Sequence, residues 1–164
     1  MAVPIRPWRR EGWDHGRSGV QLWSTNDPFD AALVPGVIEY EIGQGDEIAV
    51  AIAIAIATDL TKDVLEYLRE QNLPVGKLIV LTPPGGTAQD GSVPDSTAAN
   101  ALAVGIRDHL RQSTRRARHM HLFLACPMGL AVLLGNRWNR LCQTVVYEDI
   151  KIDDGYEAAF TVEA

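Results

Sequence analysis

The chain has 164 residues, of which 46% are hydrophobic and 22% are charged, and its formal net charge is −6. These values are typical of one globular domain that can bury a core, and they exclude a disordered chain. The negative charge argues against a broad surface for duplex nucleic acid, which needs many Lys and Arg side chains. It leaves room for a small anionic ligand, which needs only a local group of donors.

The two cysteines, Cys126 and Cys142, are too few for a disulfide framework and have no metal-ligand spacing around them. Residues 1–17 are rich in Arg and Trp, so we do not expect a signal peptide there. The longest apolar run is about ten residues, which is too short to span a membrane. We therefore expect a cytoplasmic protein with no metal and no membrane segment.

Residues 1–35 form an irregular segment in which Pro, Gly, Asp and Asn interrupt any periodicity. Three of the four tryptophans, Trp8, Trp13 and Trp23, lie there, so we expect the segment to pack onto the domain or onto a partner. Residues 36–164 have the patterns of regular structure. We divide the chain into these two parts.

Two strands are predicted at the start of the domain. GVIEYEIG at 36–43 alternates apolar and polar residues, which is typical of a half-buried strand. EIAVAIAIAIA at 47–57 alternates isoleucine and alanine, so large side chains lie on one face and small ones on the other. Because both faces are apolar, this segment is predicted to be a central strand covered by helices, with the alanines allowing one helix to come close.

The rest of the chain alternates helices with strands. We predict helices at 62–72, 97–118 and 127–138, buried strands at 77–83 and 119–126, and two final strands at 141–148 and 156–163 joined by a turn. Asp59 or Thr61 is positioned to cap the first helix. The fold class is α/β, with a mostly parallel sheet flanked by helices and a C-terminal antiparallel hairpin.

Three junctions follow the predicted parallel strands: ATDLTK at 57–62, TPPGG at 82–86 and ACPMG at 125–129. Ligands of open α/β sheets bind outside the carboxyl ends of the strands. In ATDLTK, hydroxyls and a lysine meet the start of a helix, whose free N–H groups and dipole favour a phosphate.

Each of these features also has a plain structural interpretation. The residues of ATDLTK could only cap a helix, TPPGG lacks the ending of a phosphate loop and fits an ordinary turn, and ACPMG could be a helix entry with a buried thiol. His119 and His121 would share one face of a strand but lack a third metal ligand. Cys126 has no assignable partners as a nucleophile.

No paired carboxylates, nucleophile elbow or dinucleotide fingerprint occur in the sequence, so the residues favour a binding module over an enzyme.

The segment HLFLACPMGLAVLLGNRWNRLCQTVVYE, followed by YEAAFTVE, resembles the C-terminal part of SAVED domains. AVAIAIATDLTKDVLEYL, KLIVLTPPGG and ANALAVGIRDHLR precede it in the family's order, and the likeness covers residues 36–164. SAVED domains are pairs of CARF-like units that bind cyclic oligonucleotides in CBASS and type III CRISPR antiviral defence, and binding switches on an effector. This chain has the length of one such unit, so its pocket is expected to need a second chain or an N-terminal half.

The resemblance implies a ligand-binding set at the three junctions. The residues it assigns are Thr58, Asp59, Leu60, Thr61, Lys62, Pro83, Cys126, Pro127, Met128 and Gly129. It also implies a cyclic di-, tri- or tetranucleotide as ligand, no other cofactor, and a homo-oligomer or an effector subunit as partner.

The leading hypothesis is a non-enzymatic sensor that binds such a ligand and then oligomerises or activates an antiviral effector. Two alternatives stay open. The same pocket could cleave its ligand without a metal, as a ring nuclease does, or the domain could be a structural scaffold for protein interaction.

Overall fold

The computed structural model describes residues 2–4, 22–54, 60–89, 91–151 and 155–163. Its strands are β1 (Ala2–Pro4), β2 (Leu22–Ser24), β3 (Gly36–Glu41), β4 (Glu47–Ala53), β5 (Val75–Thr82), β6 (His119–Ala125), β7 (Gln143–Lys151) and β8 (Gly155–Val162). Its helices are α1 (Leu60–Glu70), α2 (Ser96–Ser113) and α3 (Met128–Asn136). Within these described ranges, no helix combines the length and apolarity that a membrane span requires.

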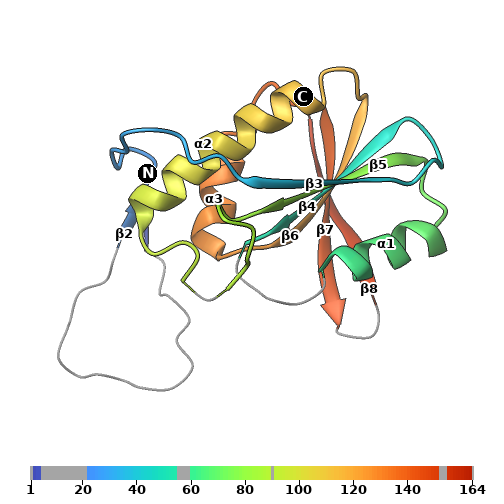
Figure 1. Ribbon diagram of the computed structural model, residues 1–164, viewed down its shortest axis with the longest axis horizontal. Helices are drawn as coiled ribbons and strands as arrows, with labels where there is room; N and C mark the ends of the chain where they lie inside the picture. Colours follow the sequence, from blue (N-terminus) through green and yellow to red (C-terminus); the bar gives the residue numbers. More distant parts are fainter. Residues whose placement is uncertain (1, 5–21, 55–59, 90, 152–154, 164) are drawn as a thin grey trace.

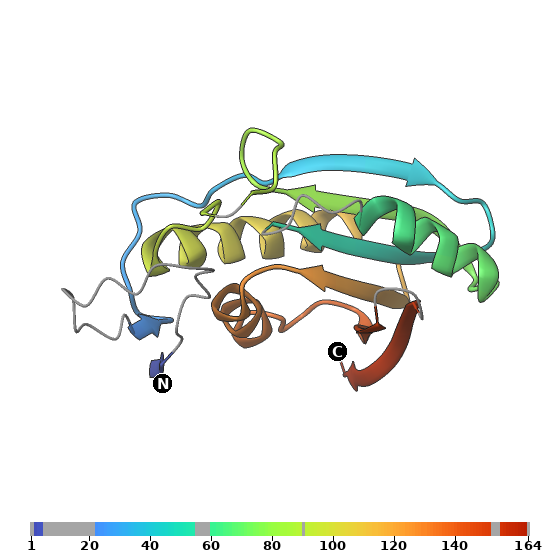
Figure 2. The ribbon, with the colours of Figure 1, turned by 90° about the horizontal axis from the view of Figure 1, so that it is seen from below.

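Six strands form the main sheet in the order β3-β5-β4-β6-β7-β8. The four inner strands are parallel, while β3 pairs with β5 and β8 pairs with β7 in the antiparallel sense. In Figure 2 the arrowheads of β4 and β6 accordingly point to the same side, opposite to that of β3. The predicted α/β class, the parallel core and the C-terminal hairpin are confirmed.

The alternation in β4 divides the core into two layers. Val50, Ile52 and Ile54 pack with α2 and α3 on one face of the sheet. Ala49, Ala51 and Ala53 pack with α1 on the other face, through Leu60, Val64 and Leu68. The prediction of a central strand covered on both faces is confirmed, and Figure 1 shows α1 on the opposite side of the fanned strands from α2 and α3.

The strand β3 differs from its prediction. It forms at the expected place, but Val37 is 38% and Ile38 is 48% exposed, so neither face is well buried. The reason is its position at the sheet edge, where β5 is its one neighbour. Alternation along a sequence predicts a face and does not reveal the place of a strand in the sheet.

Helix ends also refine the predictions. Asp95 caps α2, since its side chain accepts a hydrogen bond from the Ala98 N–H at 2.8 Å. Thr61 is the second residue of α1 and therefore lies inside the first turn instead of capping it. The other cap candidate, Asp59, lies outside the described residues.

A buried polar network joins three strands near the amino ends of the parallel sheet. Nε2 of His121 lies 2.7 Å from Oε2 of Glu47, and Nδ1 of His121 lies 2.9 Å from the hydroxyl of Tyr147. The Tyr147 ring stacks on Phe123 with centroids 4.6 Å apart, and burial is the main cause that raises the pKa of Tyr147 to about 12. Both ring nitrogens of His121 are engaged, so this histidine has a structural use.

Removing the Tyr147 hydroxyl should destabilise the fold, because it leaves a buried nitrogen of His121 without its partner. We expect Tyr147→Phe to lower the free energy of unfolding by about 1–3 kcal/mol in urea denaturation. The control is Gln143→Ala. Gln143 lies on the same strand as Tyr147, and the change removes its exposed hydrogen bond to Glu163, so the free energy of unfolding should fall by less than about 0.5 kcal/mol. Equal losses in the two variants would contradict the role of the network.

Residues 22–35 form a strap that lies along α2. The Leu33 N–H donates to the carbonyl of Ala101 at 3.0 Å, and Nδ2 of Asn100 donates to the carbonyl of Ser24 at 2.6 Å. Nη2 of Arg137 donates to Oδ1 of Asn100 at 2.8 Å and to the carbonyl of Thr25 at 3.2 Å. Residues 22–35, the described part of the N-terminal segment next to the domain, are therefore packed onto the domain. This was one of the two predicted alternatives, the other being packing onto a partner.

The strap depends on a glycine. A Cβ at Gly105 would collide with the backbone carbonyl of Leu33. We expect Gly105→Ala to destabilise the chain by about 1–3 kcal/mol through overpacking, despite the better helix propensity of alanine. Gly135→Ala is the matched control, because a Cβ there meets nothing within 4 Å, and it should stabilise the chain by about 0.5–1 kcal/mol. Thermal denaturation of both variants measures the difference, and shifts of the same sign would reject the close contact.

Candidate functional site

Topology brings the three predicted junctions to one edge of the sheet. β4 lies between β5 and β6, and all three run parallel, so their carboxyl ends are adjacent. Ala53 is opposite Ala125 in the register, and the Ile54 N–H donates to the Ala125 carbonyl at 2.9 Å. The segments that leave β4 and β6 therefore start side by side.

The two connections then turn to opposite faces. The chain after β4 leads to α1 on the alanine face, while the chain after β6 leads to α3 on the isoleucine face. This is a topological switch point, the place where open α/β sheets bind their ligands. The positive ends of the α1 and α3 dipoles both lie at this edge.

The start of α3 leaves backbone amides without a partner inside the helix. Pro127 occupies the cap position and makes no side-chain capping bond, and the first internal bond is from the Ala131 N–H to the Pro127 carbonyl at 3.1 Å. The amides of Met128, Gly129 and Leu130 precede that bond and have no partner within the helix. Met128 is 73% exposed, whereas Gly129 and Leu130 are buried.

The residues predicted after β4 fall into two groups. Thr58 and Asp59 lie outside the described residues. Leu60 is buried in the core against the alanine face, whereas Thr61 is half-buried and Lys62 is exposed. Of the described residues in this junction, Thr61 and Lys62 are the ones whose side chains reach the surface.

A shallow groove of about 420 Å³ runs beside α1. Its lining is Tyr40, Thr61, Lys62, Leu65, Glu66 and Arg69. Tyr40 and Arg69 were not predicted, and no local motif marks them, because Tyr40 reaches this place through the pairing of β3 with β5. The groove lies toward β3, while Cys126 to Gly129 lie on the β6 side of β4.

The junction after β5 is a tight turn. The Gly86 N–H donates to the Pro83 carbonyl at 2.9 Å, and Gly85 and Gly86 have positive φ of 93° and 87°. Pro83 itself is buried. The plain-turn interpretation of TPPGG therefore accounts for its glycines.

A second hollow, of about 110 Å³, lies between α3 and the strands β6 to β8. Its walls are apolar and include Leu124, Trp138 and Phe160. It offers no donors for a phosphate.

Comparison with known proteins places the chain in a family. Residues 6–162 match SAVED, described as the SMODS-associated and fused to various effectors sensor domain. The chain belongs to the SAVED family. The match begins within the N-terminal segment, thirty residues before the likeness predicted from the sequence.

One relative is CD-NTase-associated protein 4 of Enterobacter hormaechei subsp. hoffmannii (strain UCI 50), which is 30% identical over 135 residues. That alignment covers 81% of this chain and 26% of the relative. The chain thus spans about a quarter of the curated relative that it matches.

Solved structures of the Cap4 SAVED/CARF-domain containing receptor of Acinetobacter baumannii have the same fold. The complex with the cyclic trinucleotide 3′3′3′-cAAA matches with a TM-score of 0.66 and 22% identity, over 87% of this chain and 31% of the receptor. The complex with 2′3′3′-cAAA also matches with a TM-score of 0.66 and 22% identity, over 87% of this chain and 30% of the receptor. A third structure of the receptor, whose description names no ligand, matches with a TM-score of 0.59 and 21% identity, over 87% of this chain and 28% of the receptor.

The pKa of Cys126 distinguishes a reactive nucleophile from a buried thiol at a helix entry. Burial raises the pKa of this thiol to about 12, so almost none of it is thiolate at neutral pH. We expect Cys126 in a Cys142→Ser background to react with Ellman's reagent at pH 8 more than about 100-fold more slowly than free cysteine. Reaction at the rate of the free thiol would restore Cys126 as a candidate nucleophile.

Proposed function

We propose that this chain is a sensor unit that binds a cyclic oligonucleotide at the carboxyl ends of β4 and β6. The observation that carries the proposal is the switch point in a SAVED-family domain, where α1 and α3 both start at one edge of the sheet, on opposite faces. The receptor with the same fold, Cap4, is described in complex with cyclic trinucleotides, which supports a ligand of this class.

The ligand carries one negative charge per phosphodiester linkage, and the proposed site supplies matching groups. The uncapped amides of α3 would donate to one phosphate, as helix starts do for anions. Lys62 adds a cation in the first turn of α1, beside the hydroxyl of Thr61.

The other predicted contacts have narrower roles. Cys126 and Pro127 would shape the wall beside α3, with the thiol neutral. Leu60, Pro83 and Gly129 are buried and would contribute backbone atoms only. Thr58 and Asp59 stay in the proposed set as part of the same junction.

Binding would change assembly and switch on an effector that is associated with the chain or fused to it. The family description, which links SAVED domains to various effectors, supports this step. Because the chain spans about a quarter of its curated relative, we propose that a second unit, in the same protein or in a partner, closes the pocket. We further propose that the unit acts in the cytoplasm and catalyses no reaction.

Met128→Asp provides a sharp test, because it places a carboxylate at the start of α3, where a phosphate of the ligand is proposed to bind. An acidic residue at a helix start is favourable, so the unliganded chain should be stabilised by about 0.3–1 kcal/mol. The same carboxylate should repel the ligand and abolish its effect on the melting temperature. Met128→Gln, which keeps the size without the charge, should retain ligand binding.

The measurement is thermal denaturation with cyclic di-, tri- and tetranucleotides, including both forms of cAAA. A ligand at 100 times its Kd adds about 2.7 kcal/mol to the free energy of unfolding, which is a shift of roughly 5–10 °C for a domain of this size. Sedimentation in the same samples follows assembly. Failure of the whole panel, with the chain alone and with its partner unit, would reject the sensor proposal.

Catalysis is tested separately. A sensor should leave its ligand intact after hours of incubation in the presence of a chelator, as followed by chromatography. In the ring-nuclease alternative, Thr61 and Lys62 would orient the ribose hydroxyl and stabilise the developing charge. Cleavage that Lys62→Gln abolishes would establish the enzyme instead.

A further inference from the structure

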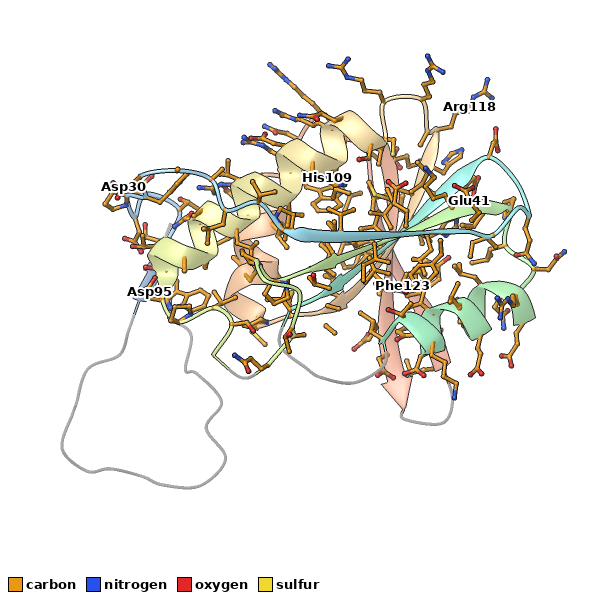
Figure 3. All side chains as sticks on the ribbon, in the orientation of Figure 1. Asp30, Glu41, Asp95, His109, Arg118 and Phe123 are labelled. Carbon is orange, nitrogen blue, oxygen red and sulfur yellow. The ribbon has the colours of Figure 1, made fainter. Side chains whose placement is uncertain are left out.

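Five arginines gather at the end of the molecule opposite the proposed ligand site. They are Arg111, Arg115, Arg116, Arg118 and Arg140, and they make up one third of the 15 basic residues of the chain. We call them the arginine cluster. Four come from the end of α2 and the turn before β6, and Arg140 comes from the connection between α3 and β7. Figure 3 shows Arg118 at this end, where nitrogen-tipped side chains extend away from the ribbon.

The cluster lies at the amino ends of the parallel strands. β6 begins at His119, directly after Arg118, and β7 begins at Gln143, opposite His119 in the register. The proposed cyclic oligonucleotide site lies at the carboxyl ends of β4 and β6. The two surfaces are therefore separated by the length of the sheet.

A contact between the two segments holds the cluster together. Nη2 of Arg111 donates to the carbonyl of Asn139 at 3.1 Å and lies 3.2 Å from Oδ1 of the same residue. This fixes the end of α2 beside the turn that carries Arg140. Arg111 thus has a structural role in connecting the two segments. The other four arginines, Arg115, Arg116, Arg118 and Arg140, are exposed.

The helix dipole does not explain the cluster. Only Arg111 lies in the last turn of α2, where a cation is favoured. Arg115, Arg116 and Arg118 follow the helix, and Arg140 belongs to another element. Arg140 also has a φ of +63°, a conformation in which glycine or asparagine is easier to place.

The surroundings indicate the kind of partner. Protein interfaces have an apolar or aromatic centre. The large apolar side chains that are exposed in the described chain, such as Val34, Met128 and Phe160, belong to the strap, to α3 and to other parts of the sheet. The exposed polar residues Gln112 and Asn139 lie next to the arginines in the sequence. Two carboxylates at the same end of the sheet, those of Glu47 and Glu163, are hydrogen-bonded to His121 and to Gln143. Guanidinium groups without an apolar centre fit a row of phosphates.

We propose that the arginine cluster binds the phosphodiester backbone of a linear nucleic acid, without regard to its sequence. The net charge of −6 is an average over the whole surface and does not describe this end of it. Four exposed cations predict a weak, salt-dependent interaction whose strength comes from the release of counterions. The site is independent of the cyclic oligonucleotide site.

The test is fluorescence anisotropy of a labelled 30-base-pair duplex with the whole chain, at several NaCl concentrations from 25 to 200 mM. With four phosphate contacts, log Kd should rise with log salt concentration with a slope of about 3–4. Combining Arg115→Glu, Arg116→Glu and Arg118→Glu should weaken binding at least about 30-fold and flatten the slope, with an unchanged melting temperature.

Two controls isolate the cluster. Arg116→Glu and Arg69→Glu change the net charge equally, and both residues are exposed, but only the first should weaken binding. Replacing the three arginines by lysine should keep most of the affinity. The proposal is overturned if the duplex does not bind at 25 mM NaCl, or if the triple glutamate variant binds it as tightly as the parent chain does. Binding of a glutamate-rich peptide under conditions in which the duplex does not bind would assign the cluster to an acidic protein partner instead.

Discussion

The whole architecture depends on the close approach of α1 to the alanine face of β4. A central strand must be covered on both sides, and the small residues Ala49, Ala51 and Ala53 let one helix lie near the backbone. The isoleucines on the other face fill the wider space under α2 and α3. A larger side chain at one of these alanines would push α1 outward. It would also move the helix start that borders the proposed ligand site.

The same strand explains why the sequence predicts the fold so well. Its Ile/Ala pattern and the stripe of Leu102, Ile106 and Leu110 on α2 are local signals that agree with one another. Features that depend on distant pairings could not be predicted in this way. The exposure of β3 follows from its edge position, and the network of Glu47, His121 and Tyr147 needs the register of three strands.

The candidate site is predictable in part for the same reason. Parallel strands place their carboxyl ends at one edge, so the junctions after β4, β5 and β6 could be expected to meet there. Their side chains could not be sorted in advance, since the burial of Leu60 and Pro83 depends on packing by other elements. Tyr40 and Arg69 line the groove through tertiary contacts and carry no signal along the chain.

The bonds of Arg137 have a thermodynamic consequence. α3 begins at the proposed ligand site and ends next to Arg137, which is bound to Asn100 on α2 and to the backbone of Thr25 in the strap. A short helix moves as a rigid body, so a displacement of Met128 is transmitted to this anchor. In the proposed sensor, a coupling along this path would be reciprocal: a partner whose affinity for residues 24–25 is changed by the ligand would change the affinity for the ligand by the same factor. Residues 24–25 of the strap are thus connected to the proposed site through Arg137 and α3.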